Sequence, residues 1–521
     1  MVGYDFIVVG AGTAGCVLAR RLLERTQARV LLIEAGVRYP GLLLSPPLPG
    51  MKFGRGFSWG QRSLPQARLG NRRIEWPMGK VVGGTSSVNA MMAYLGHPAN
   101  FDAWERAGNP GWSARALGPY FQRVFGTLPG EAAGETAEGM LSLSELRFHA
   151  PFSEAFLAAC EEDGMRRESP LIGRHADSCG YFPVLQRRGE RFESARGYLG
   201  PVRNHPRLTL ITGAHVRRVM FSGDKAVGIE AVFSGKLEQW RATTGVVLCA
   251  GVFETPRILH CSGLGPAEVL RAAGIEVRRD LPQVGLNFQD HVRVGMLYRS
   301  GRVSPGAKRW WIPGVLRYLL RRDGVMASNC CESGAFLGSR PDREVPDLQL
   351  ITHFQTFGPK GEVDIEVCLV DPTSRGRVFV SPRDPYGAPL IDPNYLETEE
   401  DLLALEAGIR RVRSIAARAP LRSFPLLEEI SPGQDETTGR GLREAIFRTA
   451  TTAYHPCGTC GMGPGGVLDS GLRVRGAEAL WVADASAMPA LPSGNIACAV
   501  LVLAEKAADL IQEATEARQG L

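Results

Sequence analysis

The stretch that decides the fold reads YDFIVVGAGTAGCVLARRLLERTQARVLLIE and covers residues 4–34. Residues 4–9 are mostly β-branched and aromatic, as in a buried strand, and residues 16–27 carry apolar side chains at helical spacing. A second strand-like run follows at 29–34. A strand, a helix and a strand within about 30 residues predict a parallel βαβ unit. We therefore expect an α/β domain with a doubly wound sheet.

The turn between this strand and helix carries glycine at three spaced positions, Gly10, Gly12 and Gly15. The first permits a tight turn, the second a close approach of the backbone to a pyrophosphate, and the third close packing of helix on strand. Glu34 ends the second strand and can accept hydrogen bonds from a ribose diol. These residues predict a Rossmann-like dinucleotide site, without distinguishing NAD from FAD.

Composition excludes several classes of protein. The 521 residues are 44% hydrophobic and 22% charged, which is typical of globular chains. No apolar run reaches the roughly 18 to 20 residues of a membrane span. The net charge is only +6 and the basic residues are scattered, so we expect no nucleic-acid partner. Eleven irregularly spaced cysteines and no signal-peptide pattern favour a cytoplasmic protein.

A second group of elements follows the first. Strand-like runs at 208–212, 226–232 and 245–249 continue the first domain, together with a strand at 479–484 and a terminal helix at 496–513. Runs at 347–353, 363–370 and 377–380 precede a helix expected at 399–417. This second set predicts a separate α+β domain with an antiparallel sheet.

Four further segments resemble the glucose-methanol-choline (GMC) oxidoreductases, FAD enzymes that oxidise alcohols. The likeness extends over nearly the whole chain and includes choline dehydrogenase-like members. The segments are MGKVVGGTSSVN at 78–89, GVFETPRILHCSG at 251–263, HPCGTCGMG at 455–463 and ADASAMP at 483–489. The sequence departs from the family pattern at Met78, Val252 and Gly461, where relatives carry Arg, Ala and Arg. A positive charge usual at position 461 is therefore missing.

The resemblance implies bound FAD without a covalent tether, because Val88 stands where tethered relatives have histidine. It implies a discontinuous FAD-binding domain of residues 1–145, 190–292 and 450–521, and a substrate-binding domain of residues 146–189 and 293–449. The positions that it assigns to the cofactor are Gly10, Gly12, Thr13, Ala14, Gly15, Glu34, Ala35, Gly79, Val82, Gly83, Gly84, Ser87, Asn89, Met91, Val216, Ala250, Gly251, Asp484, Ala485, Asn495 and Ile496.

Alcohol oxidation requires a base for the hydroxyl proton and a donor that holds the developing alkoxide. His455 is our candidate base, because an imidazole accepts a proton at neutral pH without adding a negative charge beside a reduced flavin. Asn495, which lies where relatives carry Asn or His, is expected to donate a hydrogen bond to the substrate oxygen. A structural role is expected for the histidines His97, His215, His260, His291 and His353.

The sequence thus predicts FAD-dependent oxidation of an alcohol, most simply of a primary alcohol to an aldehyde. The alternative is a family member with a non-redox or other specialised reaction, such as a lyase, that uses FAD structurally. A flavin-binding protein without catalysis and an NAD dehydrogenase fit the motifs less well. Expected partners are a small-molecule alcohol and an electron acceptor, either oxygen or another redox carrier. The chain is expected to be a monomer or homodimer.

Two features stand outside this scheme. Cys457 and Cys460 form a CxxC pair, but no second pair or histidine cluster completes a zinc site, so we expect no metal and a packing role. The stretch from Lys308 to Arg322 mixes aromatic and basic residues as an interfacial helix does, and membrane contact, a lid and plain packing all remain open.

Overall fold

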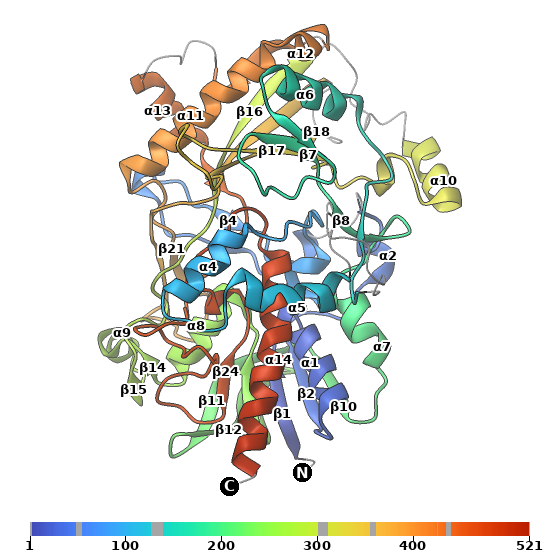
Figure 1. The fold of residues 1–521 in the computed structure, drawn as a ribbon. Helices are drawn as coiled ribbons and strands as arrows, with labels where there is room; N and C mark the ends of the chain where they lie inside the picture. Colours follow the sequence, from blue (N-terminus) through green and yellow to red (C-terminus); the bar gives the residue numbers. More distant parts are fainter. Residues whose placement is uncertain are drawn as a thin grey trace.

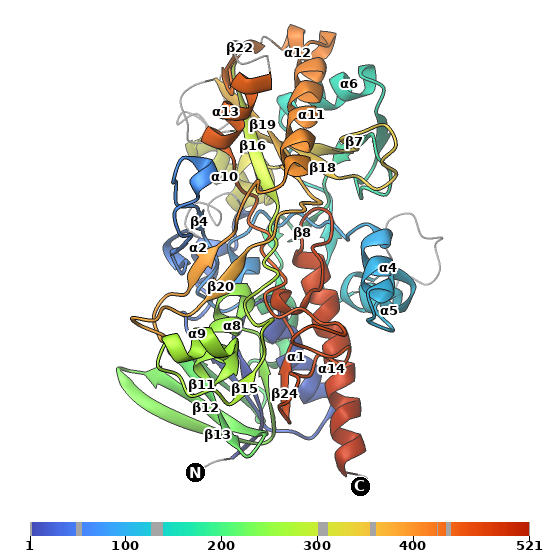
Figure 2. The same cartoon turned by 90° about the vertical axis from the view of Figure 1, so that its left-hand side faces the viewer.

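The computed structural model describes residues 3–47, 55–126, 139–300, 311–354, 361–424, 426–433 and 439–519. Two large sheets lie one above the other along the long axis of the molecule (Figure 1), and both chain termini lie at the end occupied by the first sheet. The view turned by 90° shows the same two levels (Figure 2).

The first sheet contains the predicted βαβ unit. Phe6 pairs with Val30 and Val9 with Ile33 in parallel register, and helix α1 (Thr13–Arg25) forms the crossover. All five residues of β2 are buried, as expected for a strand covered on both faces. The parallel strands, in spatial order, are β10 (Leu208–Thr212), β2 (Val30–Glu34), β1 (Tyr4–Val9), β13 (Lys236–Leu248) and β24 (Leu480–Val482).

An antiparallel ribbon extends this sheet beyond the predicted parallel strands. The long strand β13 pairs at its first half with β12 (Lys225–Phe233), which in turn pairs with β11 (Ala214–Ser222). In Figure 2 this ribbon and helix α14 (Ala497–Gln519) lie on opposite sides of the parallel strands.

The second sheet is antiparallel except for one edge pair, β6 with β7. Helix α11 (Glu399–Ala416) and helix α6 (Pro151–Glu162) lie beside it, and their apolar side chains join its core cluster. Its strands are β22 (Leu426–Ser431), β16 (Val292–Ser300), β19 (Glu362–Leu369), β18 (Leu348–Phe354), β17 (Ser333–Leu337), β7 (Ser178–Tyr181) and β6 (Arg166–Glu168), with β23 (Thr451–Thr452) beside β16. The predicted strand at 377–380 is not part of this sheet, because β20 (Arg377–Phe379) pairs separately with β21 (Leu390–Asp392).

The remaining helices and short strands lie outside the two large sheets. The other helices are α2 (Gly41–Leu44), α4 (Pro98–Arg106), α5 (Ala114–Phe125), α7 (Gly200–Val202), α8 (Gly251–Cys261), α9 (Ala267–Ala272), α10 (Trp311–Arg321), α12 (Ala419–Ser423) and α13 (Gly439–Thr449). The short strands are β3 (Gln61–Arg62), β4 (Glu75–Trp76), β5 (Leu143–Ser144), β8 (Val184–Arg187), β9 (Glu190–Arg191), β14 (Leu264–Gly265) and β15 (Arg279–Asp280).

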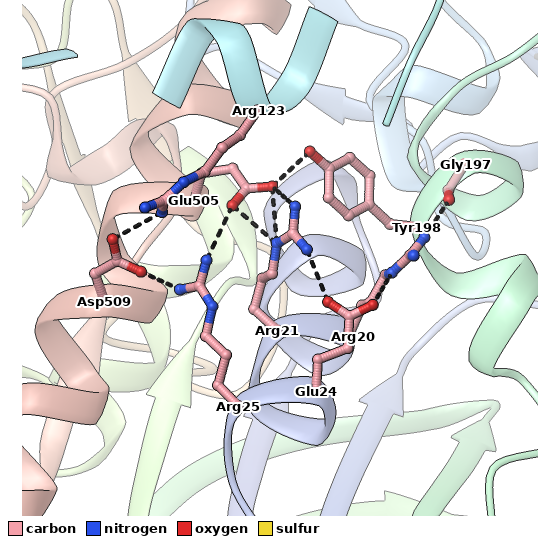
Figure 3. Close-up of polar contacts among 9 residues, drawn as sticks. All are labelled: Arg20, Arg21, Glu24, Arg25, Arg123, Gly197, Tyr198, Glu505 and Asp509. Carbon is pink, nitrogen blue, oxygen red and sulfur yellow. Dashed lines mark hydrogen bonds and ion pairs between the residues drawn. The ribbon is translucent and has the colours of Figure 1, made fainter. Parts of the chain in front are cut away.

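A buried polar cluster joins the first helix of the chain to the last (Figure 3). Arg21 on α1 donates from Nε and Nη2 to the fully buried carboxylate of Glu505 on α14, at 2.7 to 3.0 Å. Tyr198 Oη donates to the same carboxylate at 2.7 Å. Arg25 and Arg123 both pair with Asp509 one turn later. These contacts hold α14 against the βαβ unit and so place the C-terminal segments next to the glycine turn.

Candidate active site

A cavity of about 450 Å³ runs from the glycine turn of the first sheet to the underside of the second. That volume falls within the range of cofactor and ligand sites. Eighteen of the predicted site positions line it, and each sequence segment that carries a motif contributes at least one of them. They are Gly10, Gly12, Thr13, Ala14, Glu34, Ala35, Gly79, Gly84, Asn89, Met91, Val216, Ala250, Gly251, His455, Asp484, Ala485, Asn495 and Ile496.

Four predicted cofactor positions, Gly15, Val82, Gly83 and Ser87, are not among the lining residues. A Cβ on Gly15 would lie 1.8 Å from the carbonyl oxygen of Gly10, so this glycine permits helix α1 to pack against the turn. Ser87 Oγ donates to the Val82 carbonyl at 3.0 Å, and the Gly83 N–H donates to Ala11 at 2.7 Å. These residues therefore lie behind the cavity lining, and their contacts hold the loops that form the wall.

The glycine turn presents an uncapped helix N-terminus to the cavity. Gly12 is the N-cap of α1 with no side-chain cap, and no acidic residue stands in the first turn. Gly84 has a φ of +55°, and a Cβ there would lie 2.8 Å from the Gly12 Cα, so the two loops can meet only without side chains. Free N–H groups and the positive end of the helix dipole are the features by which a helix N-terminus could hold a phosphate anion.

Glu34 is held at the cavity by its own neighbours. Its Oε2 accepts the Ala11 N–H at 2.9 Å and its Oε1 accepts the Gly36 N–H at 2.7 Å. Burial raises the pKa of this carboxyl to about 7, against the effect of the two N–H donors. The remaining lone pairs of the two oxygens are available to a diol.

Asp484 ties the C-terminal motif to the second motif. Its Oδ2 accepts the Gly251 N–H at 2.8 Å and the Thr255 hydroxyl at 2.7 Å, both at the start of α8. Its Oδ1 accepts the N–H and the hydroxyl of Ser486, at 2.8 and 2.6 Å. Burial raises the pKa of this carboxyl above its ordinary value.

His455 and Asn495 meet in the cavity although 40 residues separate them. Asn495 Nδ2 lies 2.9 Å from His455 Nε2, and Gln349 Nε2 donates to Asn495 Oδ1 at 3.4 Å. Because the Asn495 amide nitrogen can only donate, His455 Nε2 must be an acceptor. The imidazole proton therefore lies on Nδ1.

His291, for which we expected only a structural role, completes the arrangement. Its Nδ1 lies 2.9 Å from His455 Nδ1, so with the proton on His455 it accepts the hydrogen bond. Burial, followed by the positive charge of Arg293, lowers the pKa of His455 to about 3. Burial also lowers the pKa of His291 well below its ordinary value. Both imidazoles are therefore neutral near pH 7, so His455 Nε2 is unprotonated there, although the burial that lowers its pKa also makes it a weaker base than a free imidazole.

Asp290 fixes the backbone of His455. Its Oδ1 accepts the His455 N–H at 2.9 Å, and its Oδ2 accepts Trp76 Nε1 at 2.9 Å, the Thr452 hydroxyl at 2.6 Å and the Tyr395 hydroxyl. Burial raises the pKa of Asp290 to about 6 even with these four donors. This carboxylate holds three separate segments around the imidazole.

The second sheet adds polar residues that no motif indicated. Arg293 on β16 pairs with Glu366 on β19, donates from Nε to the Thr452 carbonyl at 3.0 Å, and lies over the Tyr454 ring at 5.5 Å. His353 on β18 also lines the cavity. Position 461 lacks the family arginine, but Arg293 brings a positive charge near His455 from another strand. These side chains alternate with core residues along ordinary strands, so the sequence carried no signal for them.

The CxxC pair belongs to the hydrophobic core around the first sheet. Cys457 and Cys460 are fully buried and unbonded, and burial raises the pKa of both thiols. Within the described ranges, no group of three or more His, Cys, Asp or Glu side chains could hold a metal ion.

Comparison with known proteins places the chain in a family. Two family models, both described as GMC oxidoreductase, match residues 4–293 and 372–504. The chain therefore belongs to the GMC oxidoreductases, as its motifs predicted.

The relatives are similar over nearly their full length. An alcohol dehydrogenase [acceptor] of Pseudomonas putida is 37% identical, across 98% of this chain and 95% of the relative. An oxygen-dependent choline dehydrogenase of Photobacterium profundum is 34% identical, across 98% and 93%. Among solved structures, an FAD-dependent oxidoreductase from Chaetomium thermophilum is 25% identical and superposes with a TM-score of 0.90, across 98% of this chain and 99% of that one.

Proposed function

We propose that this protein is an FAD-dependent enzyme that oxidises a primary alcohol to an aldehyde, with His455 as the base. The observation that carries this proposal is the contact of 2.9 Å between His455 Nε2 and Asn495 Nδ2 inside a cavity that begins at a dinucleotide-type glycine turn. The names of the alcohol and choline dehydrogenase relatives support the same chemistry.

The lining residues fit FAD in kind and position. The N–H groups at Gly12 to Ala14 suit the pyrophosphate and Glu34 suits a ribose diol. The remaining wall consists of Gly79, residues 84–86 and 88–91, Val216, and residues 250–251, 484–485 and 495–496. Val88 also lines the cavity and offers no nucleophile, so the cofactor is held without a covalent bond. Acid precipitation tests this, because it must release all the flavin into the supernatant.

The chain's own groups perform the proton chemistry. A substrate hydroxyl that enters between the two side chains replaces their direct hydrogen bond, donates its proton to His455 Nε2 and accepts a hydrogen bond from Asn495 Nδ2. When bound, FAD supplies the two-electron acceptor for the hydride that leaves the α-carbon as the carbonyl forms. His291 accepts from His455 Nδ1 and so keeps the Nε2 lone pair directed at the substrate. Burial excludes water that would otherwise compete for this nitrogen.

The two-domain division accompanies this proposal. Residues 1–145, 190–292 and 450–521 form a Rossmann-like FAD-binding domain, and residues 146–189 and 293–449 form the substrate-binding domain. Support comes from the sheets: the first sheet draws its strands from the first group of segments. The second draws nearly all of its strands from the other group, except β23 and the first residue of β16.

A cytoplasmic location is part of the proposal, and the absence of disulfides among the eleven cysteines supports it. No helix among the described residues is long and apolar enough to cross a membrane. Oxygen or another redox carrier takes the electrons from the reduced enzyme.

Anaerobic titration of the purified yellow protein with a panel of primary and secondary alcohols tests the activity. Bleaching of the flavin band by a primary alcohol, with the aldehyde as product, is expected. A flavin that no alcohol reduces, but that dithionite does, would contradict the proposal and favour a reaction in which FAD is structural. Oxygen and an artificial dye, supplied in turn, then identify the class of acceptor.

A further inference from the structure

Helix α10 (Trp311–Arg321) exposes an unusual amount of apolar surface. Figure 1 shows it standing out from the side of the molecule, at the level of the lower part of the second sheet. Nine large apolar side chains are exposed in the described part of the chain, and five of them belong to this one helix. Their exposed fractions are 75% for Ile312, 36% for Val315, 55% for Leu316, 59% for Leu319 and 83% for Leu320. A patch of this kind on a single element indicates a binding surface.

The exposed residues share one face of the helix. At about 100° per residue, positions 312, 315, 316, 319 and 320 fall on a continuous apolar stripe. The opposite side attaches the helix to the protein, because the Tyr318 hydroxyl donates to the Gly189 carbonyl at 3.1 Å and is buried. Arg317 and Arg321 lie between these two sides. The helix is thus anchored by one face and leaves the other uncovered.

The surrounding sequence is strongly basic. From Gly301 to Arg322 the chain contains six basic residues and no acidic one: Arg302, Lys308, Arg309, Arg317, Arg321 and Arg322. Asp323 pairs with Arg317 at 2.6 Å, and Glu190 lies 3.6 Å from Arg322, so the nearby acidic groups only partly offset this charge. Trp310 and Trp311 directly precede the apolar positions. Arginine beside an apolar helix face, with tryptophan adjacent in the sequence, is typical of segments that lie in a lipid headgroup layer.

We propose that α10 docks this enzyme onto a bilayer that contains anionic phospholipid, with its apolar face in the headgroup region. A second copy of the chain fits less well, because an isologous contact through α10 would bring two clusters of like charge together. The negative surface potential of an anionic leaflet complements the same cluster. Since no described helix can span a membrane, the association is peripheral.

The helix is coupled to the cavity wall. The segment after it packs its Val325, Met326 and Ala327 near Tyr318, and Asn329 Nδ2 donates to the Ala90 carbonyl at 2.9 Å. Both Ala90 and Cys331 line the cavity. The segment that follows α10 therefore links the helix to one wall of the cavity.

Vesicle flotation of the FAD-loaded full-length protein tests the proposal. The wild type is expected to float with vesicles of phosphatidylcholine mixed with phosphatidylglycerol, to bind phosphatidylcholine alone much less, and to bind more weakly as salt rises. The double variant Leu316→Glu/Leu320→Glu should partition about tenfold less or worse, since it places two charges in the apolar face. Leu403→Glu on α11, whose side chain is 49% exposed, is the matched control and should bind as the wild type does.

Flavin content and the melting temperature check that each variant is folded. The proposal is wrong if the wild type does not float with anionic vesicles, or if the double variant floats equally well. It is also wrong if light scattering finds a wild-type dimer that the double variant dissociates while neither protein binds vesicles. In that case a second copy covers α10.

Discussion

His455 and His291 face each other with their Nδ1 atoms 2.9 Å apart, at a sequence separation of 164 residues. Only one of the two facing nitrogens carries a proton, and the hydrogen bond from Asn495 to His455 Nε2 assigns it to His455. The second histidine therefore fixes the tautomer and orientation of the first. This relationship makes the base nitrogen the one that faces Asn495.

Replacement of His291 tests this positioning role. His291→Ala removes the acceptor for His455 Nδ1, and the loss of one hydrogen bond should slow flavin reduction about tenfold. His291→Asn can still accept through its amide oxygen and should recover part of the rate. Stopped-flow reduction of both FAD-loaded variants measures this difference. Equal rates of flavin reduction in the two variants and the wild type would show that His291 contributes packing alone.

The depressed pKa of His455 predicts a pH effect on stability. Its pKa is about 3 in the folded protein and about 6.5 in the unfolded chain, so between these values the unfolded state binds more protons. This imidazole therefore contributes stability above about pH 6.5 that is lost as the pH falls toward 3. Glu34, with a raised pKa of about 7, acts in the opposite sense, since its contribution is lost as the pH rises through 7.

Comparison of the wild type with His455→Asn isolates the histidine from the acidic groups. The melting temperature of the variant should fall less steeply than that of the wild type between about pH 6.5 and 4. Parallel pH profiles for the two proteins would mean that His455 is protonated in the folded state over this range.

Substitutions of two glycines in the glycine turn, Gly12 and Gly15, should have different effects. A side chain at Gly12 meets only the Gly84 Cα at 3.9 Å, so Gly12→Asp should fold but repel the pyrophosphate and lose FAD. Gly15→Ala would place a Cβ 1.8 Å from Gly10 and should damage folding itself. Flavin absorbance and circular dichroism separate the two effects. Full flavin content in Gly12→Asp would contradict this placement of the cofactor.

The buried carboxylate of Glu505 should matter more to stability than exposed ones nearby. Glu505→Ala leaves Arg21 Nε and Nη2 and the Tyr198 hydroxyl without their acceptor, and breaking such a buried pair costs about 3–5 kcal/mol. Glu24→Ala removes a partly exposed pair with Arg20 and Arg21 and should cost about 0–1 kcal/mol. Thermal melts of both variants measure the two losses of stability. Equal losses would contradict the claim that the Glu505 contacts hold α14 against the βαβ unit.

Local sequence was enough to predict the first βαβ unit and the family. Two short-range patterns predicted this unit: the spacing of Gly10, Gly12 and Gly15, and the apolar run that forms β2. The structure has the expected strand, helix and strand. The motif around His455 and the position of Asn495 likewise identified two side chains that the structure brings into contact. The roles of these residues remain predictions.

The other half of the site depends on contacts between distant segments. Asp290 and His291 directly precede β16 and Arg293 is its second residue, and this strand pairs with β19 and β23, which follow more than 60 residues later. Nothing in their immediate neighbours indicates that they will meet His455. The separate pairing of β20 with β21 was missed for the same reason, because a strand's partner is a tertiary property.

Flavin reduction in His455→Ala is the most direct test of the central claim. The FAD-loaded variant, mixed anaerobically with a primary alcohol that reduces the wild type, should be reduced about 10²- to 10⁴-fold more slowly. Asn495→Ala should lose less, since it removes one hydrogen bond and keeps the base, and His175→Ala at an exposed position should match the wild type. A near-wild-type reduction rate in His455→Ala with full FAD occupancy would contradict the assignment of this residue as the base.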